Sequence, residues 1–248
     1  MLNKLIFSGV LPLGLIAPVV AGQTSGDMTD PVAILKKADQ ATKAVKSARY
    51  HLELTGTGAF AERLGNLTGD YLVSGFEGMG PKKFYADVQI TKPGSSEKTH
   101  LTIGGDGENY FLIDHAKKIA YQDIDPAVIG RRGQRVMGAA VIELVHPTPF
   151  SDEINGAKHE LIGSKTVAGE PCYEVRVVYR EGGPEAVWCF SKKDFLPRAR
   201  TDVFKLPTGE QAGQQRTISK LQADPKVADD AYRLKLPDGY KQTDDFAP

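Results

Sequence analysis

Apolar and polar residues alternate along most of the chain after residue 50. Leu52 and Leu54, for example, alternate with His51 and Glu53. A period of two is typical of antiparallel strands with one buried and one solvated face. It predicts eleven strands, at residues 50–55, 70–74, 83–90, 98–103, 108–113, 117–122, 157–164, 172–179, 185–191, 196–204 and 214–222.

Two segments follow the period of a helix instead. Asp30 and Pro31 are typical of a helix start, because Asp caps free backbone amides and Pro fits the first helical position. The apolar residues that follow share one face, namely Ile34, Leu35, Ala38, Ala41 and Val45. A second helical stretch is predicted over residues 128–145, ending before Pro147. Because three glycines lie near its beginning, the pattern does not determine the residue at which this helix starts.

An antiparallel sheet of about eleven strands curls, since sheets of this size rarely stay flat and open. The apolar concave face of such a sheet needs cover, and the two helices are the elements available for it. We therefore predict a mainly β (α+β) fold, an incomplete barrel whose concave face is covered by the N-terminal and central helices. Residues 30–242 are expected to form this single domain, followed by a tail over 243–248.

The chain begins with the features of an export signal. Lys4 precedes an apolar, uncharged run over residues 5–20, and small residues follow it. A membrane anchor is the alternative, but the run is shorter than the roughly 20 residues of a spanning helix and contains Pro12 and Pro18. We predict a signal peptide over 1–21, a flexible leader over 22–29, and a periplasmic or secreted protein.

Composition narrows the class of protein further. The chain has 248 residues, with 31 basic and 31 acidic residues and a net charge of zero, which argues against a dedicated nucleic-acid binder. Its 41% hydrophobic share excludes wholesale disorder. Cys172 and Cys189 flank a Gly-rich turn, so in an oxidising compartment we predict a disulfide across a hairpin, with a reactive thiol pair as the alternative.

No catalytic motif is convincing in this sequence. Residues 56–61 match a dinucleotide-binding fingerprint by letter, but a strand-like pattern follows them where that motif requires a helix. The histidines lack metal-ligand spacing, although residues on strands can converge in space, and each is interpreted as a solvated surface residue. They are His51, His100, His115, His146 and His159. We predict no enzyme activity, no metal and no cofactor.

Two groups of arginines need an interpretation. Arg131, Arg132 and Arg135 form the densest basic cluster, which fits either lipid headgroups or another anionic partner, or a solvated helix start. Arg198 and Arg200 share one strand face with Asp202, a pattern that predicts an ion-pair ladder on the surface.

Several segments together resemble a known family. After the export signal, residues 30–50 run from a helix into the first strand; residues 166–175, 187–192 and 195–198 carry a Gly turn, a Trp-bearing strand and a Leu-Pro-Arg strand. The chain closes with an acidic turn and Pro-Asp-Gly-Tyr over 237–240. This resembles the periplasmic lipoprotein-carrier superfamily typified by LolA and LolB. The resemblance implies an incomplete antiparallel barrel around helices, with an apolar cavity that accepts acyl chains. No motif places that family's acyl-gating arginine here, and a lipobox cysteine is absent.

Two functional hypotheses follow. The first is a non-enzymatic carrier of a hydrophobic ligand, a lipid or the acyl chains of a lipoprotein, with the second helix as a lid. Its predicted cavity is lined by Leu52, Leu54, Phe84, Val88, Leu101, Ile103, Met137, Val141, Leu144 and Trp188. The second is an envelope sensor or protein-interaction module, in which the same residues form a filled core. Both describe a monomer with at most transient membrane contact.

Overall fold

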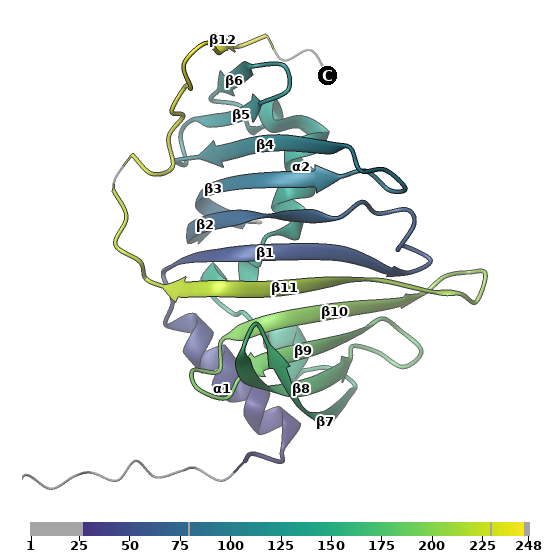
Figure 1. The fold of residues 1–248 in the computed structure, drawn as a ribbon. Helices are drawn as coiled ribbons and strands as arrows, with labels where there is room; N and C mark the ends of the chain where they lie inside the picture. The colour runs from purple at the N-terminus through teal and green to yellow at the C-terminus, as the bar shows by residue number, and fades with distance from the viewer. Residues whose placement is uncertain (1–26, 79, 229, 246–248) are drawn as a thin grey trace, which may run out of the picture.

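The computed structural model describes residues 27–78, 80–228 and 230–245, so the predicted signal peptide and the first part of the leader lie outside it. One open sheet of twelve strands dominates the described residues (Figure 1), in the order β12-β6-β5-β4-β3-β2-β1-β11-β10-β9-β8-β7. The strands are β1 (Ser47–Gly58), β2 (Leu67–Glu77), β3 (Gly80–Thr91), β4 (Lys98–Gly105), β5 (Tyr110–Asp114), β6 (Ile119–Asp123), β7 (Lys158–Val167), β8 (Glu170–Val178), β9 (Glu185–Ser191), β10 (Pro197–Lys205), β11 (Gln211–Ala223) and β12 (Lys241–Thr243). All eleven predicted strands are present, and the short β12 is the one that the alternation missed.

Two meanders meet in the middle of this sheet. Strands β1 to β6 run outward from the centre, and β7 to β11 return from the opposite edge until β11 pairs with β1 (Figure 1). All of these pairs are antiparallel; β12 alone pairs in parallel, with β6. The chain between β6 and β7 must therefore cross from one edge of the sheet to the other.

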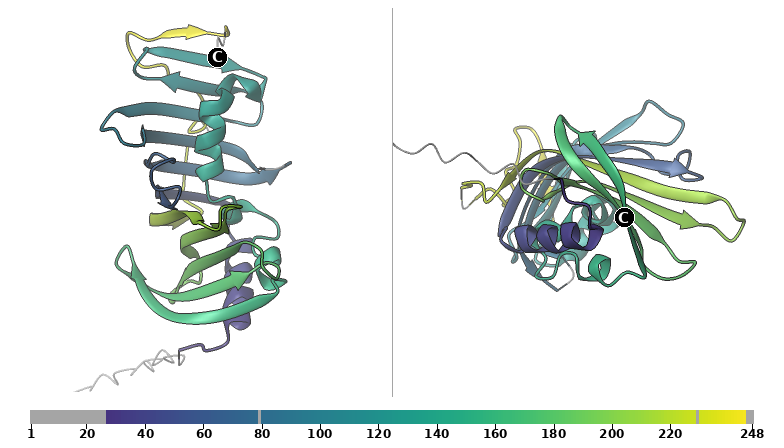
Figure 2. Two further views of the ribbon diagram at one scale, coloured as in Figure 1. Left: turned by 90° about the vertical axis from the view of Figure 1, so that its right-hand side faces the viewer. Right: turned by 90° about the horizontal axis from the view of Figure 1, so that it is seen from below.

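The sheet curves around its helices, as the view from below shows (Figure 2). Alternating residues of neighbouring strands stand opposite each other on the concave face; Val88 on β3, for instance, faces Leu101 on β4. Both side chains are buried, while Asp87 and Gln89 beside Val88 are not. The period of two thus sorts residues onto a dry concave face and a wetter outer face, which confirms the predicted incomplete barrel.

The first helix, α1 (Pro31–Lys43), forms as predicted. The side chain of Asp30 accepts a hydrogen bond of 2.9 Å from the amide of Val32, and Pro31 occupies the first turn. The buried face of α1 lies against β8 and β9, with Ile34, Leu35 and Ala38 in one apolar cluster with Trp188. Met28 packs partly against this cluster, so the end of the predicted flexible leader is in contact with the domain.

The second predicted helix is wrong as a single element. Residues 126–154 form four short pieces: η1 (Pro126–Ile129), α2 (Gly130–Ala139), η2 (Ile142–Val145) and α3 (Ser151–Ile154). Gly130 adopts a φ of 53°, which a residue with a side chain rarely does, and Ala140 is extended, so the helix breaks at both places. None of the described helices is long and apolar enough to cross a membrane.

The predicted disulfide is absent. Cys172 lies opposite Ser191 and Cys189 lies opposite Glu174, so the two cysteines are diagonal neighbours on β8 and β9 rather than a facing pair. Both are free thiols in a small cluster with Val167 and Ala199. Burial raises the pKa of Cys172 to about 11 and that of Cys189 to about 12, so both thiols stay protonated at neutral pH.

Candidate ligand site under the covering segment

Residues 126–145, here called the covering segment, cross the concave face of strands β1 to β5 (Figure 2). The side chain of Asp125 accepts a hydrogen bond of 2.8 Å from the amide of Ala127, which starts η1 at Pro126. Gly130 then turns the chain into α2. Local sequence thus sets where each piece of the segment begins, and packing on the sheet must hold the pieces in place.

The covering segment closes over most of the predicted cavity residues. One apolar cluster includes Leu52, Leu54, Phe84, Val88, Leu101 and Ile103 from the sheet and Val141 and Leu144 from the segment, and the partly buried Met137 packs against it. The sheet residues are at most 8% exposed, and Leu144 is fully buried. The structure therefore brings these nine residues together, but as a packed core beneath a closed cover.

Trp188 does not join the other predicted cavity residues. It lies in the cluster under α1, where its ring stacks on Phe190 at a centroid distance of 5.7 Å. The sequence could not separate these clusters, because strand alternation shows which face a residue occupies but not which helix covers it. Trp188 still touches the next part of the site, since Arg200 Cζ lies 4.8 Å from its ring centroid.

Two buried tyrosines fasten the covering segment to the sheet. Tyr71 Oη donates a hydrogen bond of 3.0 Å to the carbonyl of Val136, and Tyr50 Oη accepts one of 3.0 Å from the amide of Val141. The two rings stack at 5.4 Å on neighbouring strands. Burial raises the pKa of both hydroxyls well above the usual value, so each remains a neutral hydrogen-bonding group.

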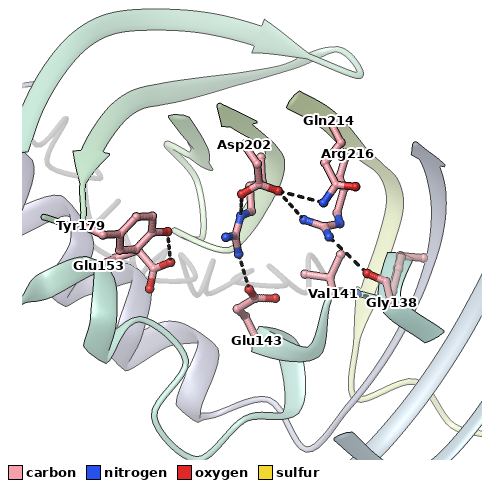
Figure 3. Close-up of polar contacts among 10 residues, drawn as sticks. Gly138, Val141, Glu143, Glu153, Tyr179, Asp202, Gln214 and Arg216 are labelled. Atoms are coloured by element: carbon pink, nitrogen blue, oxygen red, sulfur yellow. Dashed lines mark hydrogen bonds and ion pairs between the residues drawn. The ribbon is translucent and has the colours of Figure 1, made fainter. Parts of the chain in front are cut away.

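An ion network forms a second set of attachments (Figure 3). Asp202 accepts hydrogen bonds from Arg200 Nε at 2.6 Å, from Arg216 Nη1 at 2.9 Å and from Gln214 Nε2 at 3.2 Å. Asp202 is 5% exposed, so its charge needs these partners.

The two arginines of this network then reach the covering segment. Arg200 Nη1 donates to Glu143 Oε1 at 2.9 Å, and Arg216 Nη2 donates to the carbonyl of Gly138 at 3.2 Å. Burial opposes the charge of Arg200, but Asp202 and Glu143 outweigh it and raise its pKa. Tyr179 Oη donates to Glu153 Oε1 at 2.8 Å at the margin of the network.

This network corrects the predicted surface ladder. Arg200 and Asp202 lie on the concave face, where Arg200 is opposite Trp188, whereas Arg198 lies at a bulge between Pro197 and Ala199 and is only 4% exposed. Arg198 pairs separately with Glu170 and Asp194. Ala199 lies in the outer cluster with the cysteines, so alternation places its neighbour Arg200 on the concave face, but no pattern in the sequence marks the bulge at Arg198.

A cleft of about 440 Å³ opens beside α2 at one side of the covering segment. Ile90 and Leu101 contribute apolar lining, and the predicted basic cluster lies at its margin. Arg132 Nη1 donates to the buried Asp114 at 2.6 Å, and Arg135 Nη2 donates to the carbonyl of Gly65 at 2.6 Å. Arg131 is exposed and makes no hydrogen bond or ion pair within the described residues. The cleft thus combines an apolar wall with a free cation.

The outer face of the sheet carries two features that the sequence did not place. A cavity of about 650 Å³ lies between the strands and the C-terminal segment, lined among others by Tyr85 and Arg233. His100 and His115 converge there with Asp87, so the interpretation of these histidines as separate solvated residues is wrong.

Among the comparisons with known proteins, only the solved structures give matches. No family model matches the sequence, and no curated protein does. Among solved structures, LprF from Mycobacterium bovis has a TM-score of 0.50 and 11% identity, over 86% of this chain and 100% of that one.

The fold is that of LprF, an open antiparallel sheet curled around helices. A LolA superfamily protein from Nitrosomonas europaea is also similar, with a TM-score of 0.34 and 13% identity over 83% of this chain and 98% of its own. MucB matches with a TM-score of 0.47 and 14% identity, and the match covers 83% of this chain and 63% of MucB. Identities this low show a shared fold alone and leave function to be argued from the site.

Proposed function

We propose that this protein is an exported, non-enzymatic carrier of a hydrophobic ligand, a lipid or the acyl chains of a lipoprotein. The observation that carries the proposal is the cleft beside α2, where the apolar lining of Ile90 and Leu101 meets the unpaired Arg131. A lipid with an acyl chain and an anionic head group fits this arrangement: the chain would contact the apolar lining, and the head group would pair with Arg131. The solved structures of similar fold include LprF, MucB bound to MucA, and the lipoprotein LppX, which agrees with an envelope protein.

Binding requires the covering segment to act as a lid. Its attachments are buried apolar side chains, Val136, Val141 and Leu144 among them, together with polar contacts from Tyr50, Tyr71, Arg200 and Arg216. Each polar contact contributes about 0.5–1.5 kcal/mol net, or somewhat more where a charge is involved. Burial of an acyl chain contributes about 0.8 kcal/mol for each CH₂ group. An acyl chain would thus replace the apolar contacts of the lid side chains with its own, and its further CH₂ groups would offset the loss of the polar contacts.

In the open state, the ligand would lie where the lid side chains now pack. Met137, Val141 and Leu144 would move away from the sheet. The acyl chain would then contact Leu52, Leu54, Phe84, Val88 and Ile103, while its head group stays near Arg131. Release reverses the exchange, either at a membrane that the protein touches transiently or on a partner protein. The mature protein is proposed to be a periplasmic or secreted monomer without a cofactor.

One observation favours a second candidate function. The nine clustered residues pack against one another without a ligand, as expected for a sensor or protein-interaction module with a filled core. Such a module would bind a protein partner through the rim of the sheet and would take up no lipid.

Native mass spectrometry separates the two functions. The mature protein is purified from an exporting host, sprayed under gentle conditions and then extracted with solvent. We expect a stoichiometric lipid adduct, or 1:1 uptake of palmitate and of phosphatidylglycerol by the delipidated protein. A clean apo mass that stays unchanged with both ligands would exclude the carrier and favour the interaction module.

A matched pair of variants then tests the site. Arg131→Gln removes the unpaired cation at the cleft, whereas Arg180→Gln removes an exposed arginine in the β8–β9 turn. We expect a severalfold loss of palmitate affinity in the first variant and none in the second, with uptake of an uncharged fatty alcohol unchanged in both. Equal losses in the two variants would show that palmitate binds elsewhere.

A further inference from the structure

A row of polar side chains crosses four adjacent strands on the outer face. His51 on β1 stands opposite Asp70 on β2, Asp70 opposite Asp87 on β3, and Asp87 opposite Thr102 on β4. Two carboxylates therefore face each other across neighbouring strands, an arrangement that is destabilising unless positive charge compensates it. His51 Nδ1 lies 2.7 Å from Asp70 Oδ1, so one of the two carboxylates has a histidine as its partner.

Two histidines converge on the other carboxylate. His100 precedes Thr102 on β4, and its Nε2 lies 2.5 Å from Asp87 Oδ1. His115 directly follows β5, and its ring stacks on that of His100 with a centroid distance of 3.8 Å. One ligand atom from each of Asp87, His100 and His115 lies within 4.8 Å of the other two. Three potential metal ligands from three chain segments thus meet at one point.

The surrounding hydrogen bonds fix these side chains as a metal site would require. Tyr240 Oη lies 3.0 Å from His115 Nδ1, which leaves Nε2 as the ligand atom. Thr102, which is 4% exposed, donates a hydrogen bond of 3.2 Å to Asp87 Oδ1. Its hydroxyl also lies 2.8 Å from His115 Nε2, a contact that the metal ion would replace. A second partner on the ring and on the carboxylate is the usual support of metal ligands.

We propose that Asp87, His100 and His115 bind a divalent transition-metal ion of the zinc class. Two imidazoles and one carboxylate suit Zn²⁺, Co²⁺, Ni²⁺ and Cu²⁺ better than Mg²⁺ or Ca²⁺, which prefer oxygen ligands alone. Metal bonds of about 2.0–2.2 Å require the two rings to unstack and the ligand atoms to move by less than about 1 Å. The ion would place a +2 charge beside Asp87 and Asp70.

The position of the site suggests what the ion does. Asp87 and His115 line the outer cavity of about 650 Å³, so remaining coordination positions would face water or a ligand there. His115 also contacts Tyr240 of the C-terminal segment, in an edge-to-face ring pair at 5.6 Å. A bound ion would therefore fasten that segment to β3, β4 and the end of β5, on the opposite face from the proposed lid.

Metal titration of the tag-free, chelator-treated mature protein tests this inference. Calorimetry with ZnCl₂ is expected to give one site, CoCl₂ to give visible d–d absorption, and Zn²⁺ to raise the melting temperature. His100→Ala, His115→Ala and Asp87→Asn should each weaken Zn²⁺ at least about tenfold. His51→Ala is the matched control, since His51 pairs with a carboxylate on the same face but is outside the triad, and it should change the affinity by less than twofold.

Two results would overturn the site. One is the absence of 1:1 binding at 100 μM metal in the wild-type protein. The other is binding that survives both histidine substitutions while circular dichroism shows folded variants. Tyr240→Phe adds a check on the support role: it keeps the fold and the three ligands, and it should weaken Zn²⁺ by a smaller factor than the ligand variants. Lipid uptake is measured separately and depends on the other face.

Discussion

The two halves of the concave face are covered in different ways. Under α1, one continuous helix of 13 residues packs on interlocked rings, with Phe150 edge-on to Trp188 and Phe190 at 5.1 Å each. Under the covering segment, short helical pieces lie on the sheet and are attached by tyrosines and arginines. Interdigitated rings cannot separate without losing all of their contacts, whereas a few polar contacts can break and re-form with water. The α1 half is therefore the fixed half, and the covering segment, which also buries apolar residues against the sheet, is the half proposed to open.

The largest expected effect comes from the fixed half. Phe150→Ala removes the ring that contacts both Trp188 and Phe190, and it leaves a cavity in a fully buried position. We expect the free energy of unfolding to fall by about 3–5 kcal/mol, measured by urea denaturation followed by Trp188 fluorescence. A loss below about 1 kcal/mol would mean that the two halves do not differ in packing.

The ion network should give the next largest effect. Asp202→Asn leaves Arg200 and Arg216 without their shared carboxylate, and we expect a loss of about 2–3 kcal/mol because both arginines retain some exposure. Amide hydrogen exchange should speed up over residues 138–145 and stay unchanged in α1. Asp238→Asn is the control at an exposed carboxylate. Uniformly faster exchange across both halves would contradict a separable lid.

The tyrosine contact should have a smaller and more local effect. Tyr50→Phe removes the acceptor for the amide of Val141, which costs about 1–2 kcal/mol because the amide is left buried. The Val141 amide is expected to exchange faster, and fatty-acid uptake is expected to accelerate. Tyr85→Phe, on the outer face, is the control. Slower uptake in Tyr50→Phe would argue against lid opening as the step that admits ligand.

The smallest effect should come from a polar contact at the margin of the fixed half. Lys192 Nζ lies 2.8 Å from Asp27 and 4.9 Å from the Tyr173 ring centroid. Lys192→Ala should lower the free energy of unfolding by less than about 1 kcal/mol, since its partner Asp27 is exposed and water screens the ion pair from that side. A loss comparable to that of Asp202→Asn would show that both halves depend on polar contacts.

The sheet was highly predictable, because each strand carries its own evidence. Residues such as Phe84, Ala86, Val88 and Ile90 alternate with polar neighbours, and all four are buried in the structure. The start of the first helix was equally predictable from local sequence, since the Asp30 cap and Pro31 act within its first turn. In contrast, Gly130 could belong to a helix or break one, and only its φ of 53° in the structure shows that it separates η1 from α2.

The candidate site was predictable in part. Nine of the ten predicted cavity residues share a cluster, because strand face and helix face together select them. Trp188, the cysteine pair and the ladder of Arg198, Arg200 and Asp202 were misjudged. The environment of each depends on segments far apart in the chain. The register of β8 against β9 places the cysteines, and the packing of α1 and the covering segment on the sheet places Trp188 and Arg200.

The sequence by itself determined the strands, the first helix, the open curled sheet and the apolar face that needs cover. Local periodicity and helix capping suffice for these, since they act over a few residues. The tertiary structure alone decided which helix covers which half, how the arginines turn inward, and that Asp87, His100 and His115 meet. These features depend on strand register and on contacts between residues far apart in the chain. The alternation of apolar and polar residues within one strand does not show which strands pair with it or in what register.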